Sequence, residues 1–181
     1  MAEAVPLAQA LERIAPHDID AEEGLLAACI IEGGHEIFAD CLQAGISPDS
    51  FYRPAHRLIF EALMELVKDD KVGVDEIILA DKLRVLGHLD EAGGFEGLNR
   101  LTGRIETTVH ANYWMEIVQE KAMRRGLIKA CTGVVEDCYQ PVGEIGDYLE
   151  KIEQDIFNLR NDRGSTMAEP FSGPVEAASQ L

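Results

Sequence analysis

The acidic and histidine side chains of this sequence are the groups most able to do acid–base chemistry, and their spacing does not suit a catalytic site. The acid pairs Glu22-Glu23 and Glu136-Asp137 are adjacent residues in segments with a helical pattern. Adjacent helical residues do not face each other, so we expect these carboxylates to diverge instead of converging on one substrate atom. The five histidines are scattered, and His56 is expected to be structural. The sequence therefore predicts no catalytic residues.

Metal-ligand spacings are also missing from the sequence. There is no H-E-x-x-H or C-x-x-C, and residues 69–75 lack the alternating oxygen ligands of a calcium loop. Four cysteines lie among apolar neighbours, where we expect each to be a small buried hydrophobic side chain: Cys29, Cys41, Cys131 and Cys138. This usage is typical of an intracellular chain. We therefore predict no metal site.

Nucleotide binding is not expected either. A phosphate-binding loop of the form G-x-x-x-x-G-K-[ST] needs a lysine directly after a glycine, and no glycine of this chain is followed by lysine. We therefore expect no ATP-driven chemistry and no cofactor in this chain.

The charge balance of the chain bears on its partners. Its 33 acidic residues exceed its 16 basic residues, which gives a net charge of −17. Such a field repels the phosphates of nucleic acids, so we expect little direct nucleic-acid binding. The acidic surface would attract a basic partner protein, or it serves solubility alone.

Two groups of basic residues stand out against this acidic background. Arg53 and Arg57 lie near a predicted helix start, where the helix dipole disfavours cations. We expect them to have carboxylate partners in the fold, with a partner-binding surface as the alternative. The second group is a basic band along one predicted helix, made of Lys121, Arg124, Arg125 and Lys129. This basic band is either a solvated face or a contact for an acidic surface on a neighbouring subunit.

All the elements that would position these residues are predicted to be helices. Over residues 16–106, apolar residues recur at steps of three and four, which favours a small helical globule. Asp18 and Asp75 suit helix N-caps, Pro54 suits a first helical turn, and Gly87 suits a helix end.

Residues 107–161 are predicted to form a long antiparallel helical hairpin. Thr107 or Thr108 would cap a helix running to about Tyr139, and a return helix would run from Glu144 to Leu159 with a single apolar stripe. The remaining residues are predicted to be a flexible arm at 1–15 and, at 162–181, a linker with the start of a possible linker helix. The predicted fold class is all-α.

Four stretches carry a resemblance to a known family. They are Pro-His-Asp-Ile-Asp-Ala-Glu at 16–22, the run at 51–60 with Phe-Tyr, His-Arg and Ile-Phe, the Ala-Gly-Gly-Phe run at 92–95, and the hairpin pattern at 114–157. In this order they resemble the N-terminal domain of bacterial replicative DNA helicases of the DnaB type. The resemblance spans residues 16 to about 160. Gly97 departs from it, because the family usually has an aromatic residue there, so we expect different local packing.

The resemblance implies a non-catalytic collar domain. In that family the domain assembles into a ring through dimer contacts, supports the hexamer and receives primase or a helicase loader during DNA replication. ATP and Mg²⁺ would belong to a motor domain missing here. Two alternatives are a fragment of the ATP-dependent helicase enzyme and a free-standing regulator that mimics the collar. The acidic start and the short apolar run at residues 25–31 suggest a cytoplasmic protein without a membrane span.

The hairpin also leads to a hypothesis about self-association. The predicted return helix covers only about half of the long helix, which leaves apolar surface for a second copy. We expect the hairpins of two copies to pair, with the basic band facing acidic residues of the neighbour. In the alternative, Trp114 packs into its own globule. The candidate interaction residues are Tyr113, Trp114, Ile117, Lys121, Arg124, Arg125, Ile156 and Phe157.

Overall fold

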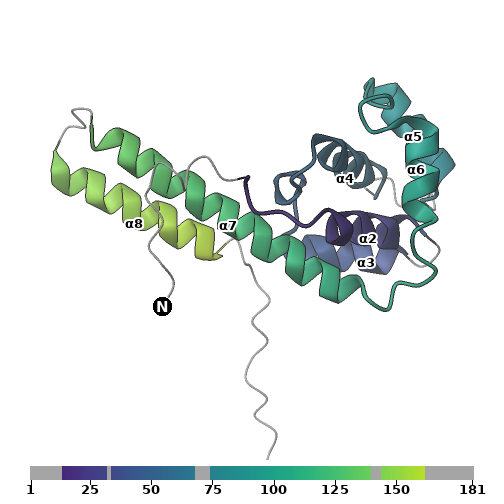
Figure 1. Cartoon of the computed structure of the whole chain (residues 1–181), viewed down its shortest axis with the longest axis horizontal. Helices are drawn as coiled ribbons and strands as arrows, with labels where there is room; N and C mark the ends of the chain where they lie inside the picture. Colours follow the sequence, from purple (N-terminus) through teal and green to yellow (C-terminus); the bar gives the residue numbers. More distant parts are fainter. Residues whose placement is uncertain (1–13, 32–33, 68–73, 140–143, 162–181) are drawn as a thin grey trace, which may run out of the picture.

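The computed structural model describes residues 14–31, 34–67, 74–139 and 144–161, and every regular element in these ranges is helical. A globule lies at one end, and one long helix leaves it to pair with the last helix (Figure 1). The elements are α2 (Ile19–Ile30), α3 (Gly34–Gln43), the short 3-10 helix η1 (Pro48–Ser50), α4 (Pro54–Val67), α5 (Glu76–Leu86), α6 (Gly94–Thr102), α7 (Ala111–Asp137) and α8 (Ile145–Asn161). The predicted all-α fold, a small globule followed by a long hairpin, is confirmed.

Some predicted segments lie outside the described residues. The predicted arm at 1–15 falls there except for its last two residues, and the linker at 162–181 falls there completely. Both stay predictions.

Local sequence signals set several helix ends as predicted. Asp18 caps α2 by accepting a hydrogen bond from the Ala21 N–H at 3.0 Å. Asp75 caps α5 by accepting bonds at 2.9 and 2.8 Å from the N–H groups two and three residues on. Pro54 is the first residue of α4. Gly87 ends α5 in the left-handed region, at φ +81°, where a side chain would be strained.

The start of the long helix differs from the prediction. Helix α7 begins at Ala111, with His110 as its N-cap and no side-chain cap bond, and not at Thr107 or Thr108. The Thr107 hydroxyl instead accepts a bond from the Val109 N–H, only two residues on, at 3.3 Å. A threonine used in this local turn cannot cap the helix that follows.

Helix α2 lies at the centre of the globule. It packs against α3, α4, α6 and α7, and nine of its twelve residues are buried, so it is covered on nearly all sides. Beside it, the Phe60 ring lies 5.1 Å from both the Phe38 and the Phe51 rings, measured between centroids. Burying large side chains of this kind is the main contribution to folding stability.

The first turns of α7 belong to this core. Met115 and Val118 are buried, and Trp114 and Ile117 pack against the core cluster. We expected this side of the helix to be exposed. The alternative, in which Trp114 packs into its own globule, describes the structure, because α2 offers Gly24 as a flat surface for the indole.

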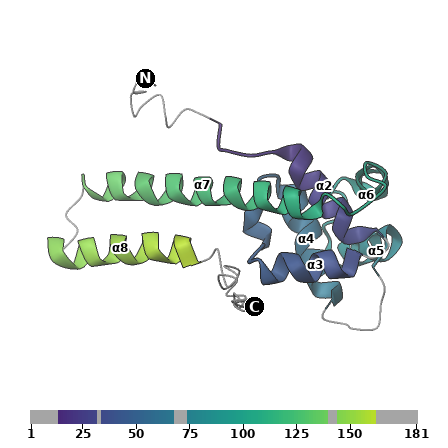
Figure 2. The same cartoon turned by 90° about the horizontal axis from the view of Figure 1, so that it is seen from below.

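Beyond the globule, α7 continues into solvent and α8 returns along it (Figure 2). The Tyr148 hydroxyl donates a hydrogen bond to Asp137 Oδ2 at 3.1 Å, which ties the two helices near the far end of the hairpin. The hairpin is therefore a two-helix arm whose base is anchored in the globular core.

The prediction that all four cysteines are buried is half wrong. Cys29 and Cys41 are buried, with their sulfur atoms 3.9 Å apart, whereas Cys131 and Cys138 are exposed. The reason is that Cys131 lies on α7 past the globule and Cys138 directly follows that helix, where α8 is the only described element beside it. All four are free thiols.

Candidate functional site

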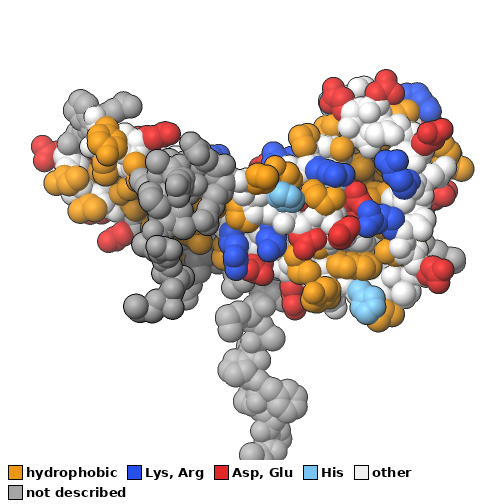
Figure 3. Space-filling model, viewed as in Figure 1, with side chains coloured by type: hydrophobic (Ala, Val, Ile, Leu, Met, Phe, Trp, Pro, Cys, Tyr) orange, Lys and Arg blue, Asp and Glu red, His pale blue; other side chains and the backbone are white. Residues whose placement is uncertain are grey.

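The hairpin presents a row of apolar side chains to solvent. Figure 3 shows hydrophobic side chains gathered on the hairpin end of the molecule. Side chains from both helices contribute to this hairpin patch, which consists of Leu127, Ile128, Ile145, Leu149, Ile156 and Phe157, all 40–66% exposed. Exposed apolar groups that are contiguous usually mark a surface for another protein. The hairpin patch is thus the first candidate site.

The residues that we expected at a single contact surface lie in two separate regions of the structure. Ile156 and Phe157 lie in the hairpin patch, 47% and 52% exposed, but Trp114 and Ile117 pack in the globule. The Tyr148–Asp137 hydrogen bond sets which residues of the two helices lie side by side. With a helix rise of about 1.5 Å per residue, Ile156 is then roughly 20 Å from Trp114 along the hairpin. The two groups therefore do not form one patch within a single chain.

Tyr113 and the basic band are not part of the hairpin patch either. Tyr113 is 63% exposed at the globule end of α7. Arg124 is ion-paired with Glu120 one turn earlier on the same helix. Lys121 is half-buried. Arg125 instead donates hydrogen bonds to the backbone carbonyls of Pro16 and Ser50. Arg125 therefore binds α7 to its own globule and is not a free group for a neighbour.

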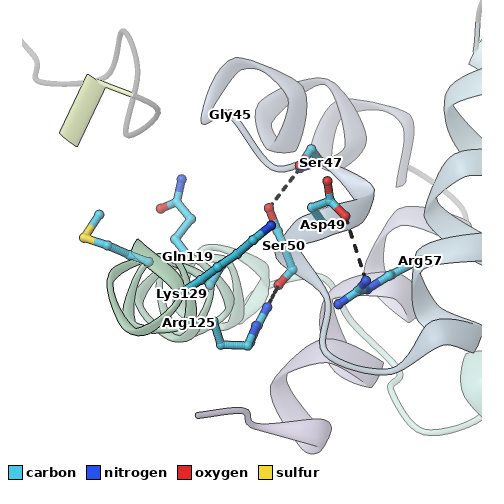
Figure 4. Close-up of a pocket in the computed structure, with 11 residues that line it drawn as sticks. Gly45, Ser47, Asp49, Ser50, Arg57, Gln119, Arg125 and Lys129 are labelled. Atoms are coloured by element: carbon cyan, nitrogen blue, oxygen red, sulfur yellow. Dashed lines mark hydrogen bonds and ion pairs between the residues drawn. The ribbon is translucent and has the colours of Figure 1, made fainter. Parts of the chain in front are cut away.

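Arg125 lies in a cleft where the hairpin leaves the globule, which we call the neck cleft. It has a volume of about 720 Å³ and opens to solvent. Figure 4 shows Gln119, Arg125 and Lys129 reaching it from α7, while Arg57 points in from α4 across η1. Its lining is Gly45, Ser47, Asp49, Ser50, Arg57, Gln119, Ala122, Met123, Arg125, Gly126 and Lys129.

The neck cleft carries more positive than negative charge. Arg57 donates its Nε–H to the Phe51 carbonyl at 2.8 Å and reaches Asp49 only at 3.9 Å, where that carboxylate is 96% exposed. Burial lowers the pKa of the Arg125 guanidinium; the charge of Glu22 opposes this shift, and the like charge of Arg57 adds to it. The arginine still carries its proton at neutral pH because its ordinary pKa is so high.

The expectation that Arg53 and Arg57 have carboxylate partners is confirmed most clearly for Arg53. Its guanidinium lies 3.1 Å from Glu23 Oε1. Arg104 from the α6 side contacts the same Glu23 and also Asp20, at 2.7 Å. These pairs are exposed, so each adds little to stability.

A buried acid–histidine pair joins α2 to α4. Glu22 Oε2 lies 2.7 Å from His56 Nδ1, and both side chains are almost fully buried. Glu22 also accepts bonds from the Tyr52 and Arg53 N–H groups at 2.7 and 3.4 Å, just before α4 begins. Burial alone would raise the pKa of Glu22, but the His56 bond and the two N–H groups together outweigh it, and the pKa is lowered.

This arrangement corrects one prediction about the acid pair. Glu22 and Glu23 do not diverge: Glu23 Oε1 lies 4.0 Å from His56 Nε2, so both carboxylates face the same imidazole. The expected structural role of His56 agrees with its burial and its bond to Glu22. The pair holds the start of α4 in place, and with it Arg57 at the neck cleft.

In the ranges that the structure describes, no group of three or more His, Cys, Asp or Glu side chains could hold a metal ion. Within the same ranges, every helix is too short or too polar to cross a membrane.

The described residues form an all-α domain that consists of a helical globule and a projecting two-helix hairpin. The family comparison is more specific. The model of the DnaB-like helicase N-terminal domain matches residues 14–120, more than half of the chain. The chain belongs to this family.

Individual relatives agree with the family. The chain is 32% identical over 148 residues to the replicative DNA helicase DnaB of Leifsonia xyli and 30% identical over 154 residues to that of Geobacillus stearothermophilus. These alignments cover 82% and 85% of this chain but only 32% and 33% of the relatives, so the chain spans about a third of their length.

A solved structure shows the same fold. The crystal structure of the N-terminal domain of DnaB helicase from Mycobacterium tuberculosis matches with a TM-score of 0.72 and 28% sequence identity. The match covers 80% of this chain and 99% of that one.

Proposed function

We propose that this chain is a non-catalytic collar domain of a replicative DNA helicase, which joins copies of the helicase into a ring and docks primase or a helicase loader during DNA replication. The family assignment supports the helicase part of this proposal. ATP and Mg²⁺ would act in a motor domain, because this chain has no Gly-Lys step for a phosphate loop. The cytoplasm is the expected location for such a protein.

The single observation that carries the assembly role is the hairpin patch. Phe157, Leu149 and Ile128 are 52%, 54% and 48% exposed on a two-helix arm that projects from the globule (Figure 2). Two helices bury mainly the surface between them, so within the described part of the chain these apolar side chains stay exposed. A second hairpin could supply that cover by helix–helix packing.

Replacing a patch residue tests this role. We expect Phe157→Ala to weaken self-association by about tenfold or more, because a buried aromatic side chain at an interface commonly contributes over ~1.4 kcal/mol. Val85→Ala is the matched control, since Val85 is 82% exposed on α5, in the globule. Sedimentation equilibrium would measure both dissociation constants, with helical content checked by circular dichroism. Equal association of the two variants would remove the hairpin patch from the interface.

A further inference from the structure

The neck cleft is lined mainly by positive charges, although the chain as a whole is acidic. The whole chain has 33 acidic and 16 basic residues. Yet the lining of the neck cleft contains three cations, Arg57, Arg125 and Lys129, and one carboxylate, Asp49. A local reversal of this kind on an acidic surface gives an oppositely charged partner a defined place to bind.

The cations of the neck cleft are poorly neutralised inside the chain. Among the described residues, Arg125 donates hydrogen bonds to carbonyl oxygens only, and the nearby charge of Glu22 offsets its charge in part. Arg57 reaches the exposed Asp49 only at 3.9 Å, and within the described ranges Lys129 forms no ion pair. By contrast, Arg53 and Arg104 on the globule share the Glu23 carboxylate. Carbonyl groups satisfy the hydrogen-bonding of a guanidinium without cancelling its charge. An incoming carboxylate would therefore meet positive charge that the chain compensates only in part.

The size and lining of the neck cleft suit a peptide. A volume of about 720 Å³ is far larger than a single small ion needs and lies in the range of cavities that hold extended ligands. Ala122 and Met123 add apolar surface beside the cations, and methionine adapts to many shapes. None of the lining side chains is aromatic, so the cleft lacks the rings on which successive bases stack in single-strand binding sites.

From this geometry we infer that the neck cleft is a docking site for an acidic peptide segment of a partner protein, one that carries apolar side chains between its carboxylates. Such a segment would contact α4 through Arg57 and α7 through Lys129, so it would bridge the globule and the hairpin. The inference rests on the partner-docking part of the proposed function and is independent of self-association through the hairpin patch.

The test uses a short fluorescein-labelled peptide of Glu, Asp and Leu, with fluorescence anisotropy as the readout. We expect the full chain to bind it and Lys129→Glu to weaken binding by about tenfold, because the change reverses one charge in the cleft. Lys121→Glu is the matched control: it makes the same charge change on the same helix but lies outside the cleft lining. Binding by this variant should stay within about twofold of the wild type. Arg57→Gln provides a second variant from the globule side.

Several outcomes would overturn the inference. They are no binding of the acidic peptide, equal weakening by Lys121→Glu and Lys129→Glu, or displacement of the peptide by a thymidine oligonucleotide at matched charge. The last result would make the cleft a general polyanion site. Light scattering of Arg57→Gln, a variant on the globule side of the cleft, should give the wild-type oligomer. If the peptide fails to bind while the oligomer forms normally, the cleft assignment fails alone and the assembly role stands.

Discussion

The indole of Trp114 lies so close to Gly24 that a Cβ atom added at residue 24 would be 2.7 Å from Trp114 Cδ2. Side-chain carbons do not approach that closely without displacement, so only glycine fits there. The contact presses the first turns of α7 onto α2. It therefore fixes where the hairpin starts and in which direction it leaves the globule.

The first prediction concerns this contact. We expect Gly24→Ala to lower the free energy of unfolding by about 1–3 kcal/mol, because the rigid indole or the α2 backbone must move to make room. Urea denaturation would measure the loss. Gly133→Ala is the control: this helical glycine of α7 has open space where its Cβ would be, so alanine should be neutral or stabilise by up to ~1 kcal/mol. Equal stability of the two variants would show that the contact with Trp114 is loose.

The second prediction concerns the pH dependence of Glu22. Its pKa is lower in the folded chain than the ordinary value of 4.5, so between these two values the unfolded state binds more protons. The stability contributed by the carboxylate is therefore complete above about pH 4.5 and is lost as the pH falls through the folded pKa.

Glu22→Gln tests this sign. At neutral pH we expect the substitution to lower the free energy of unfolding by about 1–3 kcal/mol, because buried hydrogen bonds to a charged group are lost. The difference in the free energy of unfolding between this variant and the wild type should shrink as the pH falls below 4.5. Glu116 is exposed, so Glu116→Gln should unfold with the wild-type free energy at every pH. Urea denaturation over a pH series would measure both, and a gap that widened in acid would contradict the bonding at Glu22.

The third prediction uses the thiols. Cys131 and Cys138 are exposed, while Cys29 is buried beside Cys41, and its pKa is raised by that sulfur contact and by burial. Since the thiolate is the reactive form, we expect two fast and two slow thiols in the native chain. Labelling with DTNB at low protein concentration, with a urea-denatured sample as control, would count them. Four equally fast thiols in the native chain would contradict the core packing of α2 on α3.

The fourth prediction concerns single-stranded DNA. With a net charge of −17, we expect weak or absent binding at physiological salt. Anisotropy of a labelled thymidine oligonucleotide would test this. Micromolar or tighter binding that falls steeply with salt would show that the basic residues act together on phosphates.

The features that were predictable from the sequence are those decided by neighbouring residues. Asp18, Asp75 and Gly87 set helix ends through groups within a few positions of themselves, and the apolar periodicity located the helices. Thr107 shows the limit of this approach, because several local bonds compete for one hydroxyl and only the fold selects among them.

The buried contacts and the neck cleft could not be predicted, because they join residues that are far apart in the sequence. Trp114 is half-buried because Gly24, ninety positions earlier, leaves room for its indole, and Glu22 and Glu23 converge because both contact His56. The neck cleft combines residues from Gly45 to Lys129, so no local spacing pattern could indicate it. By contrast, Ile156 and Phe157 were identifiable, since a short return helix leaves its outer face uncovered whatever the details of packing.

The central claim is that the hairpin joins copies of this chain, and the molar mass in solution tests it most directly. Light scattering coupled to size exclusion should show the mass rising with concentration from 19.9 kDa towards twice that value. Raised salt should alter this rise less than Phe157→Ala does, because the contact is mainly apolar. A mass that stays at 19.9 kDa up to high micromolar concentration would contradict the account.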